Sequence, residues 1–358
     1  MRIERPGWLR SNLRRRAVWP GLLVAAVLLP LVLSVYHLTI LTQILIFGLF
    51  AMSLDLLVGY TGLVSLGHAA FFGLGAYAAG YAAIHWSPSA LLTLPVGIAV
   101  AAAGALVIGF LSIRARGVYF LMITLAFAQM IHAAATKAFS ITGGSNGLSG
   151  IPRPTLGLDS GLLWQGVPFY YFVLAGFAIS ALVLARIVAS PFGRVLLGIR
   201  ENEERMRAIG YDTQRLKLAA FVIAGSFAGL AGALYAAYNG IVAPSDVHWS
   251  VSGDALIMVI VGGAGTLGGP VLGAAIFLVL QNLVSSITER WQLIAGAIFI
   301  FFVLALPGGV IRLFNGTAVR PGWRGGQARP ARARESQPLA VGGSRPLGVA
   351  PPARERAE

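Results

Sequence analysis

Long uncharged apolar runs separated by short polar links dominate this sequence. The runs lie at about 18–36, 40–58, 68–86, 90–112, 117–138, 167–188, 218–239, 254–263, 270–288 and 291–311. Most of them approach the roughly 20 residues that a helix needs to cross a bilayer. Because lipid offers no hydrogen-bond partners to a backbone, we expect these runs to be helical. The sequence therefore predicts an all-α, polytopic membrane protein with about ten spans.

The composition agrees with this fold class and excludes several kinds of chemistry. The chain is 57% hydrophobic and only 11% charged, whereas soluble domains carry about 25% charged residues. It has no cysteine, which excludes disulfides, thiol catalysis and Cys-ligated metals. The run at 254–263 is too short to cross alone. Its glycine-rich continuation to residue 270 makes it either a broken span or a re-entrant helix.

The net charge of +14 follows the spacing of the apolar runs. Basic residues gather in 2–16, in 194–217 and from Arg312 onward. Since basic loops mark the cytoplasmic side of membrane proteins, we interpret them as topology determinants rather than as a nucleic-acid site. Both termini are then cytoplasmic. We expect a basic N-terminus at 1–17, a transmembrane domain at 18–312 and a disordered Arg/Pro/Gly-rich tail at 313–358.

One long polar segment, residues 190–217, interrupts the apolar runs. Its charges are too costly to place in a membrane, so it is predicted to be a cytoplasmic loop. A short surface helix followed by a glycine turn is indicated by Glu203, Glu204, Ala208 and Gly210. Three apolar residues fall near one predicted helical face, Ile199, Met206 and Ile209. Such a face fits a groove on a partner protein.

Several polar residues and glycines lie inside the apolar runs. Asp55 is either a functional intramembrane carboxylate or a hydrogen-bonded residue at a helix end. The segment 59–79 is predicted to contain a broken helix, and it either lines a cavity or packs tightly against other helices. The residues that would line a translocation pathway are Asp55, Gly62, Gly67, His68, Gly75 and Gln129. Packing is the favoured alternative for His68, and bonding between helices is favoured for Gln129.

The sequence offers little that would support catalysis. The glycine-rich segment 262–270 lacks the Lys-Ser/Thr ending of a phosphate-binding loop, so close helix packing is favoured there. Neither a nucleophile–base pair nor a cluster of metal ligands is recognisable in the sequence. We therefore predict that the chain is not an enzyme and binds no metal or cofactor of its own.

Five motifs occur in order along residues 40–310. They are GYTGLVSLGHAAFFGLGAYAA, GVYFLMITLAFAQM, TGGSNGLSGIP, SPFGRVLLGIRENEERMRAIGYDTQRLKLAAF and VGGAGTLGGP. Together they resemble the LivM-type permease of branched-chain amino-acid ABC importers. The resemblance implies a LivH-type permease, two ABC ATPase subunits that bind ATP and Mg, and an extracytoplasmic substrate-binding protein. It also implies a multi-pass protein of a bacterial or archaeal inner membrane, in contact with lipid.

The same resemblance assigns a role to the polar segment. The family's coupling loop, which contacts the ATPases, maps onto Glu203, Glu204, Ala208 and Gly210, although Arg205 and Met206 replace the usual small residues. The implied solute is leucine, isoleucine or valine. One alternative is a sugar-importer permease of the same superfamily. Another is a stand-alone ion-coupled secondary transporter, which needs coupling groups near the midplane that Asp55 alone supplies poorly.

Overall fold

A computed structural model describes residues 26–31, 34–155 and 166–287, together with 290, 293–294, 296–297, 299–300, 302 and 308–311. All of these belong to one unit that ends at Val319. The predicted N-terminus at 1–17 and the predicted tail at 313–358 lie outside the described residues. So do parts of the first and last predicted spans.

The described residues are almost entirely helical, which confirms the predicted fold class. The longer helices are α2 Val35–Asp55, α3 His68–His85, α4 Ala90–Ser112, α5 Val118–Lys137, α7 Gly166–Ala189, α10 Thr213–Asn239, α11 Trp249–Gly262 and α12 Gly268–Ser285. The shorter elements are η1 Leu29–Leu31, η2 Leu56–Thr61, α6 Phe139–Thr142, η3 Gly144–Asn146, α8 Pro191–Glu201, α9 Glu203–Ala208 and η5 Pro244–Val247. Strands β1 Leu148–Ser149 and β2 Ile241–Val242 pair antiparallel.

Six described helices are long and apolar enough to cross a membrane. They are α2 continued by η2, α4, α5, α7, α10 and α12. The predicted count of about ten spans is not confirmed. Helix α11 has 14 residues, which at 1.5 Å per residue is about 21 Å, shorter than a hydrocarbon core of about 30 Å.

The predicted apolar runs at 18–36 and 40–58 imply a link at residues 37–39, and such a link is absent, because α2 begins at Val35 and runs through these residues. The polar side chains that suggested a link are bonded locally. Thr39 Oγ1 donates to the Val35 carbonyl at 2.7 Å, and His37 Nδ1 lies 2.8 Å from Ser34 Oγ. Polar groups satisfied in this way are compatible with a continuous helix.

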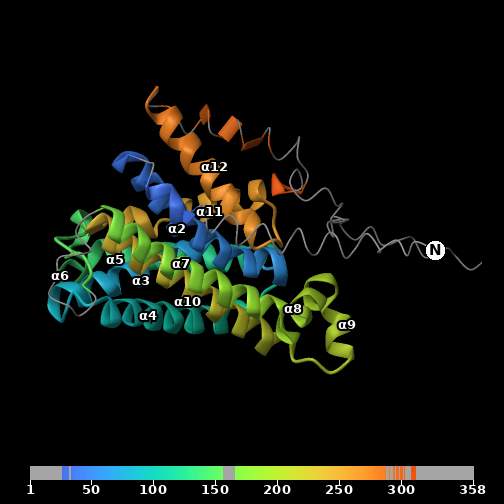
Figure 1. Ribbon diagram of the computed structural model, residues 1–358. Helices are drawn as coiled ribbons and strands as arrows, with labels where there is room; N and C mark the ends of the chain where they lie inside the picture. The colour runs from blue at the N-terminus through green and yellow to red at the C-terminus, as the bar shows by residue number, and fades with distance from the viewer. Residues whose placement is uncertain are drawn as a thin grey trace, which may run out of the picture. The chain divides into compact units, whose positions relative to one another are not determined.

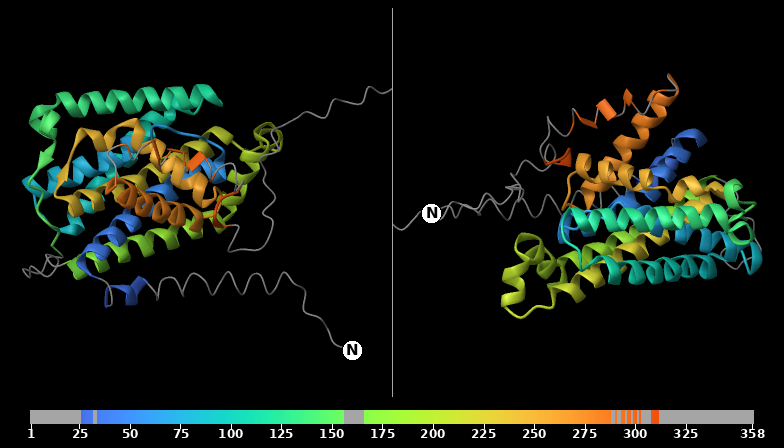
Figure 2. Two further views of the ribbon diagram at one scale, coloured as in Figure 1. Left: turned by 90° about the horizontal axis from the view of Figure 1, so that it is seen from above. Right: turned by 180° about the vertical axis from the view of Figure 1, so that it is seen from behind.

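Helices α3, α4 and α10 lie side by side and pack closely (Figures 1 and 2). A Cβ atom added to Gly75 would collide with the backbone of Gly229, and one added to Gly97 would lie 2.9 Å from the Gly75 carbonyl oxygen. Close approach through small residues is how helices associate in lipid, where apolar burial alone gives no advantage. Helix α3 buries 13 of its 18 residues in this way.

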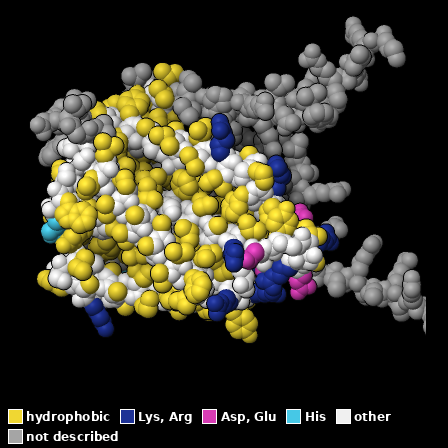
Figure 3. All heavy atoms as spheres, turned by 90° about the horizontal axis from the view of Figure 1, so that it is seen from below, with side chains coloured by type: hydrophobic (Ala, Val, Ile, Leu, Met, Phe, Trp, Pro, Cys, Tyr) yellow, Lys and Arg dark blue, Asp and Glu magenta, His cyan; other side chains and the backbone are white. Residues whose placement is uncertain are grey.

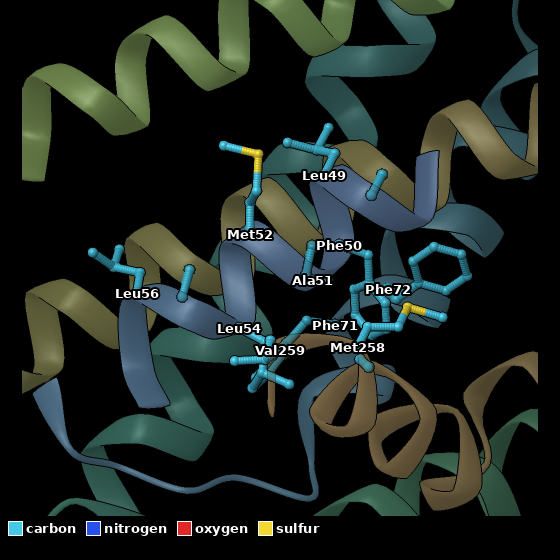
Figure 4. Close-up of a cluster of buried hydrophobic side chains, with 14 of the residues drawn as sticks. Leu49, Phe50, Ala51, Met52, Leu54, Leu56, Phe71, Phe72, Met258 and Val259 are labelled. Carbon is cyan, nitrogen blue, oxygen red and sulfur yellow. The ribbon is translucent and has the colours of Figure 1, made fainter. Parts of the chain in front are cut away.

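The centre of the bundle is a cluster of large apolar side chains where α2, α3 and α11 meet (Figure 4). The labelled members are Leu49, Phe50, Ala51, Met52, Leu54, Leu56, Phe71, Phe72, Met258 and Val259. The rings of Phe50 and Phe72 are tilted, with centroids 4.8 Å apart. Because these contacts are fully buried, they fix how α11 sits against the two longer helices.

Two of the helical paths are interrupted, and glycines make both interruptions. Helix α2 continues as the π-helical turn η2, ends at Gly62 in a left-handed conformation (φ +78°), and runs irregularly to α3. This confirms the predicted broken helix. Helices α11 and α12 form an antiparallel hairpin, in which Gly262 and Gly273 meet backbone atoms of Gly269 and Met258. The predicted packing role of segment 262–270 is therefore confirmed.

The bundle has two chemically different ends. We call α8, α9 and the start of α10 the charged end. In Figure 3 its Lys, Arg, Asp and Glu side chains gather at one edge of a mainly hydrophobic face. We call α6, η3, β1, β2 and η5 the capped end. There Leu148 pairs with Val242 and Ser149 with Ile241, and a second apolar cluster lies beneath the strands.

Candidate functional site: a two-helix segment beside the interrupted helices

The charged end is built from two short helices. Ser190 caps the start of α8, with Oγ accepting from the Gly193 N–H at 3.4 Å, and Pro191 is the first residue of the helix. The helix ends at Glu201 and is followed by Asn202, whose Oδ1 accepts from the Arg205 N–H at 2.9 Å and thereby caps α9. The predicted short surface helix exists, and it is a separate element because Asn202 breaks the path.

A glycine turn follows α9, as predicted. Gly210 has φ +96°, in the left-handed region that favours glycine. Its N–H donates to the Arg207 carbonyl at 2.9 Å. Two residues later Asp212 caps α10, with Oδ1 accepting from the Arg215 N–H at 3.1 Å. The turn therefore carries the chain from α9 into the cap of the long helix α10.

Glu203 ties α9 to the start of α10. Its Oε2 accepts from Lys217 Nζ at 2.6 Å and its Oε1 from Arg207 Nη2 at 2.7 Å, and the Thr213 hydroxyl donates to Oε1 at 3.1 Å. Burial raises the pKa of Glu203, but the bond and charge of Lys217, helped by Thr213 and Arg207, outweigh it and hold that pKa below its usual value. Lys217 is only 5% exposed, so this pair is an internal clamp.

The other predicted acidic and small positions face outward. Glu204 has a side chain that is 84% exposed, and it lies 3.9 Å from Arg116 in a loose ion pair. Ala208, the last residue of α9, is also exposed. These two positions are free to meet another surface, whereas Glu203 is occupied within the chain.

The prediction that Ile199, Met206 and Ile209 share one helical face is wrong. Ile199 belongs to α8 and is 3% exposed, facing the bundle. Met206 lies in α9 and packs against Gly198, because a Cβ there would sit 2.7 Å from its sulfur. Only Ile209 points outward. Its exposed apolar neighbours in the segment, which the sequence did not single out, are Leu197 and Tyr211.

A second set of contacts joins α8 to both interruptions. Arg200 Nη1 donates to the carbonyl oxygen of Gly59 in η2. Asp55 is fully buried at the end of α2, and its Oδ1 accepts from the Gly265 N–H at 2.7 Å. Asp55 therefore holds the turn between α11 and α12, the helix-end role that was one of its two predicted alternatives. Arg200 was not predicted from the sequence.

The proposed pathway residues do not gather in one cavity. Gly67 lies against α5, where a Cβ would meet the Thr124 carbonyl oxygen at 2.6 Å. His68 is buried, with Nε2 2.8 Å from Ser53 Oγ and its ring stacked on Phe50 at 5.4 Å. Gly75 packs on α10, as described above. This placement supports the packing alternative for these three residues.

Two of the predicted pathway residues are exposed instead. Gln129 lies on the outward face of α5, and Gly62 ends η2 beside the side chain of Arg200. A pathway role for them stays a prediction. Within the described part of the chain, no three His, Asp or Glu residues are grouped as a metal site would require.

Comparison with known proteins places the chain in a family. Residues 36–303 match the model of the branched-chain amino acid transport system / permease component family. The high-affinity branched-chain amino acid transport system permease protein LivM of Salmonella typhimurium is 30% identical over 322 residues, 84% of this chain and 76% of the relative. LivM of Escherichia coli strain K12 is 30% identical over 336 residues, 86% and 79% of the two chains.

A sugar permease is also similar over part of the length. The xylose transport system permease protein XylH of Haemophilus influenzae is 31% identical over 149 residues, 39% of each chain. No solved structure matches the chain significantly. The family model covers most of the chain and the LivM relatives most of both lengths, so the protein belongs to the branched-chain amino acid transport permease family, of the LivM type.

Proposed function

We propose that this chain is a transmembrane subunit of an ABC importer and forms half of the translocation pathway, while separate ATPase subunits supply the energy. The observation that carries the proposal is the α8–α9 segment, a capped polar unit that stands outside the apolar helices and is clamped to α10 by Glu203 and Lys217. A segment of this kind can transmit a partner's movement, because its clamp to α10 is rigid while its outward side remains exposed for binding.

The outward side of the segment offers groups that a partner can bind. Leu197, Ile209 and Tyr211 are exposed apolar side chains, and Glu204 is an exposed acid in the same segment. An apolar anchor in a groove supplies affinity, and rim charges set register and orientation. The partner we propose is an ABC ATPase subunit, two of which serve the complete importer.

A second permease, of the LivH type, would complete the pathway. Helix α5 is apolar and only 22% buried within this chain. Gln129 lies on its exposed face, where a polar amide facing lipid would lack hydrogen-bond partners. We therefore place the α5 surface, with Gln129, toward the second permease or the pathway between the two. Asp55 lies elsewhere, with Oδ1 bonded to Gly265 and Oδ2 buried without a hydrogen-bond partner among the described residues, so a pathway role for Asp55 stays a prediction.

The solute we propose is a branched-chain amino acid delivered by an extracytoplasmic binding protein. The extent of the LivM matches supports it, and the shorter XylH match keeps a sugar as the second candidate. Reconstitution in proteoliposomes with the ATPases, the second permease and the binding protein tests both. We expect ATP-dependent uptake of leucine, isoleucine or valine. Xylose uptake without amino-acid uptake would favour the sugar as solute. Ion-driven uptake in the absence of the ATPases would contradict the proposal of an ABC importer.

We further propose a multi-pass protein of a bacterial or archaeal plasma membrane, with both termini in the cytoplasm. The basic stretches of the sequence support this orientation, in which the charged end would face the cytoplasm. Reporter fusions at residue 1 and after Arg320 should both report the cytoplasm. A periplasmic signal at either fusion would contradict the proposed orientation.

A further inference from the structure

Arg200 is the one side chain of α8 that reaches both interruptions of the bundle in the structure described above. It donates to the Gly59 carbonyl in η2. A Cβ added to Gly62 would lie 3.0 Å from its Cγ, and one added to Gly265 would lie 3.4 Å from its Nη1. Glycines at these positions thus leave the space through which the guanidinium passes from α8 to the two turns.

The bond to Gly59 satisfies a carbonyl group at a helix end. Carbonyl groups in the last turn of a helix lack donors within that helix. At membrane depth such a carbonyl must find a partner in the protein. Here a charged donor on the α8–α9 segment supplies the partner, so the last turn of α2–η2 is bonded to the segment through Gly59.

The second interruption is tied to the same place. Gly265 donates to Asp55, and Arg200 Nη1 lies beside Gly265, 3.4 Å from where a Cβ there would be. The α11–α12 turn, the end of α2 and helix α8 therefore meet in one polar junction, which consists of Asp55, Gly59, Arg200 and Gly265.

We propose that Arg200 is a positioning residue that conveys displacement of the α8–α9 segment to the two interrupted helices. This inference rests on the proposed function. The buried side of α8, formed by Gly193, Leu196 and Ile199, keeps the helix seated on the bundle while it moves. The π-helical turn η2 and the glycine turn of the α11–α12 hairpin are the parts that yield, because irregular turns change conformation more readily than regular helices do.

The test uses the complete reconstituted importer with wild-type chain and three variants. Arg200→Ala removes the donor, Arg200→Lys keeps a charge with fewer donors, and Arg114→Ala removes an exposed arginine outside the junction. The natural chain has no cysteine, so Val64→Cys, at a 37% exposed position after η2, can report movement. Its labelling by a membrane-impermeant maleimide is measured without nucleotide and with ATP plus vanadate.

We expect Arg200→Ala to assemble and hydrolyse ATP, while solute transported per ATP falls roughly tenfold or more, as expected when a charge-assisted hydrogen bond is lost. The nucleotide-dependent change in Val64→Cys labelling should disappear with it. Arg200→Lys should fall between Arg200→Ala and wild type, and Arg114→Ala should match wild type.

A wild-type labelling change and transport ratio in either Arg200 variant would overturn the inference while leaving the proposed function intact. If Arg200→Ala fails to assemble, Arg200→Lys decides, since a wild-type ratio there would show that donor number and geometry do not matter. Wild-type complexes that fail to move any solute with ATP would overturn the proposed function and the inference together.

Discussion

The charged end and the capped end of this protein are held by different kinds of interaction. Four ion pairs lie at the charged end, between Arg116 and Glu204, Arg207 and Glu203, Arg215 and Asp212, and Lys217 and Glu203. At the capped end, backbone hydrogen bonds join β1 to β2, and Ile151 donates to the Gly240 carbonyl at 3.1 Å. Val242 and Val247 are fully buried beneath them.

The pKa of an acidic side chain is also shifted in opposite directions at the two ends. At the charged end, opposite charges outweigh burial and lower the pKa of Glu203. At the capped end, burial outweighs the Ala243 N–H and the Tyr235 hydroxyl, and raises the pKa of Asp246. The exposed ion pairs of the charged end can exchange partners at low cost, whereas an end built on backbone bonds and buried apolar groups resists change. We therefore expect motion at the charged end and anchoring at the capped end.

The largest effect should follow from damage to the capped end. Gly147 has φ +75°, and a Cβ there would lie 3.0 Å from the Ala243 Cα and closer still to the Val242 carbonyl oxygen. Gly147→Val combines backbone strain with overpacking, so we expect a loss of about 3–5 kcal/mol in stability. Thermal unfolding in detergent measures it, and the loss should be insensitive to salt. Unchanged melting would contradict an anchoring role for this end.

Breaking the clamp of the charged end should cost less. Glu203→Gln leaves Lys217 buried without its countercharge, and because Glu203 is partly exposed we expect a loss of about 1–3 kcal/mol. Replacing both residues, as Glu203→Gln with Lys217→Met, should recover part of it, because the unpaired charge is gone. Thermal unfolding of the two single variants and the double variant gives their coupling energy. Additive losses would show that the clamp carries no specific interaction.

Acidification should affect the two ends in opposite directions. The folded pKa of Glu203 is lowered, so its stabilising contribution is present above its ordinary pKa of 4.5 and is lost as pH falls through the folded value. The folded pKa of Asp246 is raised above 3.8, so its charged form disfavours folding and stability rises as pH falls through that window. Hydrogen exchange measured between pH 6 and 3.5 should show protection falling in α9 and rising in η5. Protection that changes in the same direction in α9 and η5 would contradict this difference between the two ends.

The smallest effect on stability should come from Glu204→Lys. Its ion pair with Arg116 is long and exposed, and such pairs contribute about 0–1 kcal/mol. Melting should therefore stay close to wild type, while binding of the ATPase subunits weakens if Glu204 lies at their rim. Pull-down of the ATPases at low and at high salt distinguishes the two effects. Strong unfolding would show that Glu204 is structural.

Local sequence signals predicted the elements whose cause lies within a few residues. The charged loop, the short helix at Glu203 and the left-handed turn at Gly210 follow from charge, capping chemistry and glycine. The broken helix after α2 followed from its glycines. The break at Asn202 was missed, although an Asn followed by two acids is a capping signal.

Contacts between residues far apart in the sequence could not be predicted from local signals. Arg200 and Gly59 are 141 residues apart, and Asp55 and Gly265 are 210 apart. Neither spacing nor composition indicates which loop an arginine reaches. Likewise the pairing of Glu203 with Lys217 depends on the angle at which α9 returns to α10. The same limit explains Ile199, which looks like a partner-facing residue in sequence and is buried in the fold.

The proposed role of the α8–α9 segment is to carry a partner's motion, and a matched pair of glycine variants tests this role most directly. Gly210 and Gly150 both have left-handed backbones, φ +96° and φ +77°, and a Cβ at either would meet no atom within 4 Å among the described residues. Gly210→Val and Gly150→Val therefore impose similar strain of about 1–3 kcal/mol, one at the charged end and one near the capped end.

The measurement is solute uptake and solute-stimulated ATP hydrolysis in the same reconstituted complexes. We predict that both fall together in Gly210→Val, while Gly150→Val keeps wild-type uptake and hydrolysis, and solute binding to the separate binding protein is unchanged in both cases. Wild-type coupling in Gly210→Val, or an equal loss in Gly150→Val, would contradict the claim that the charged end is where the motion enters.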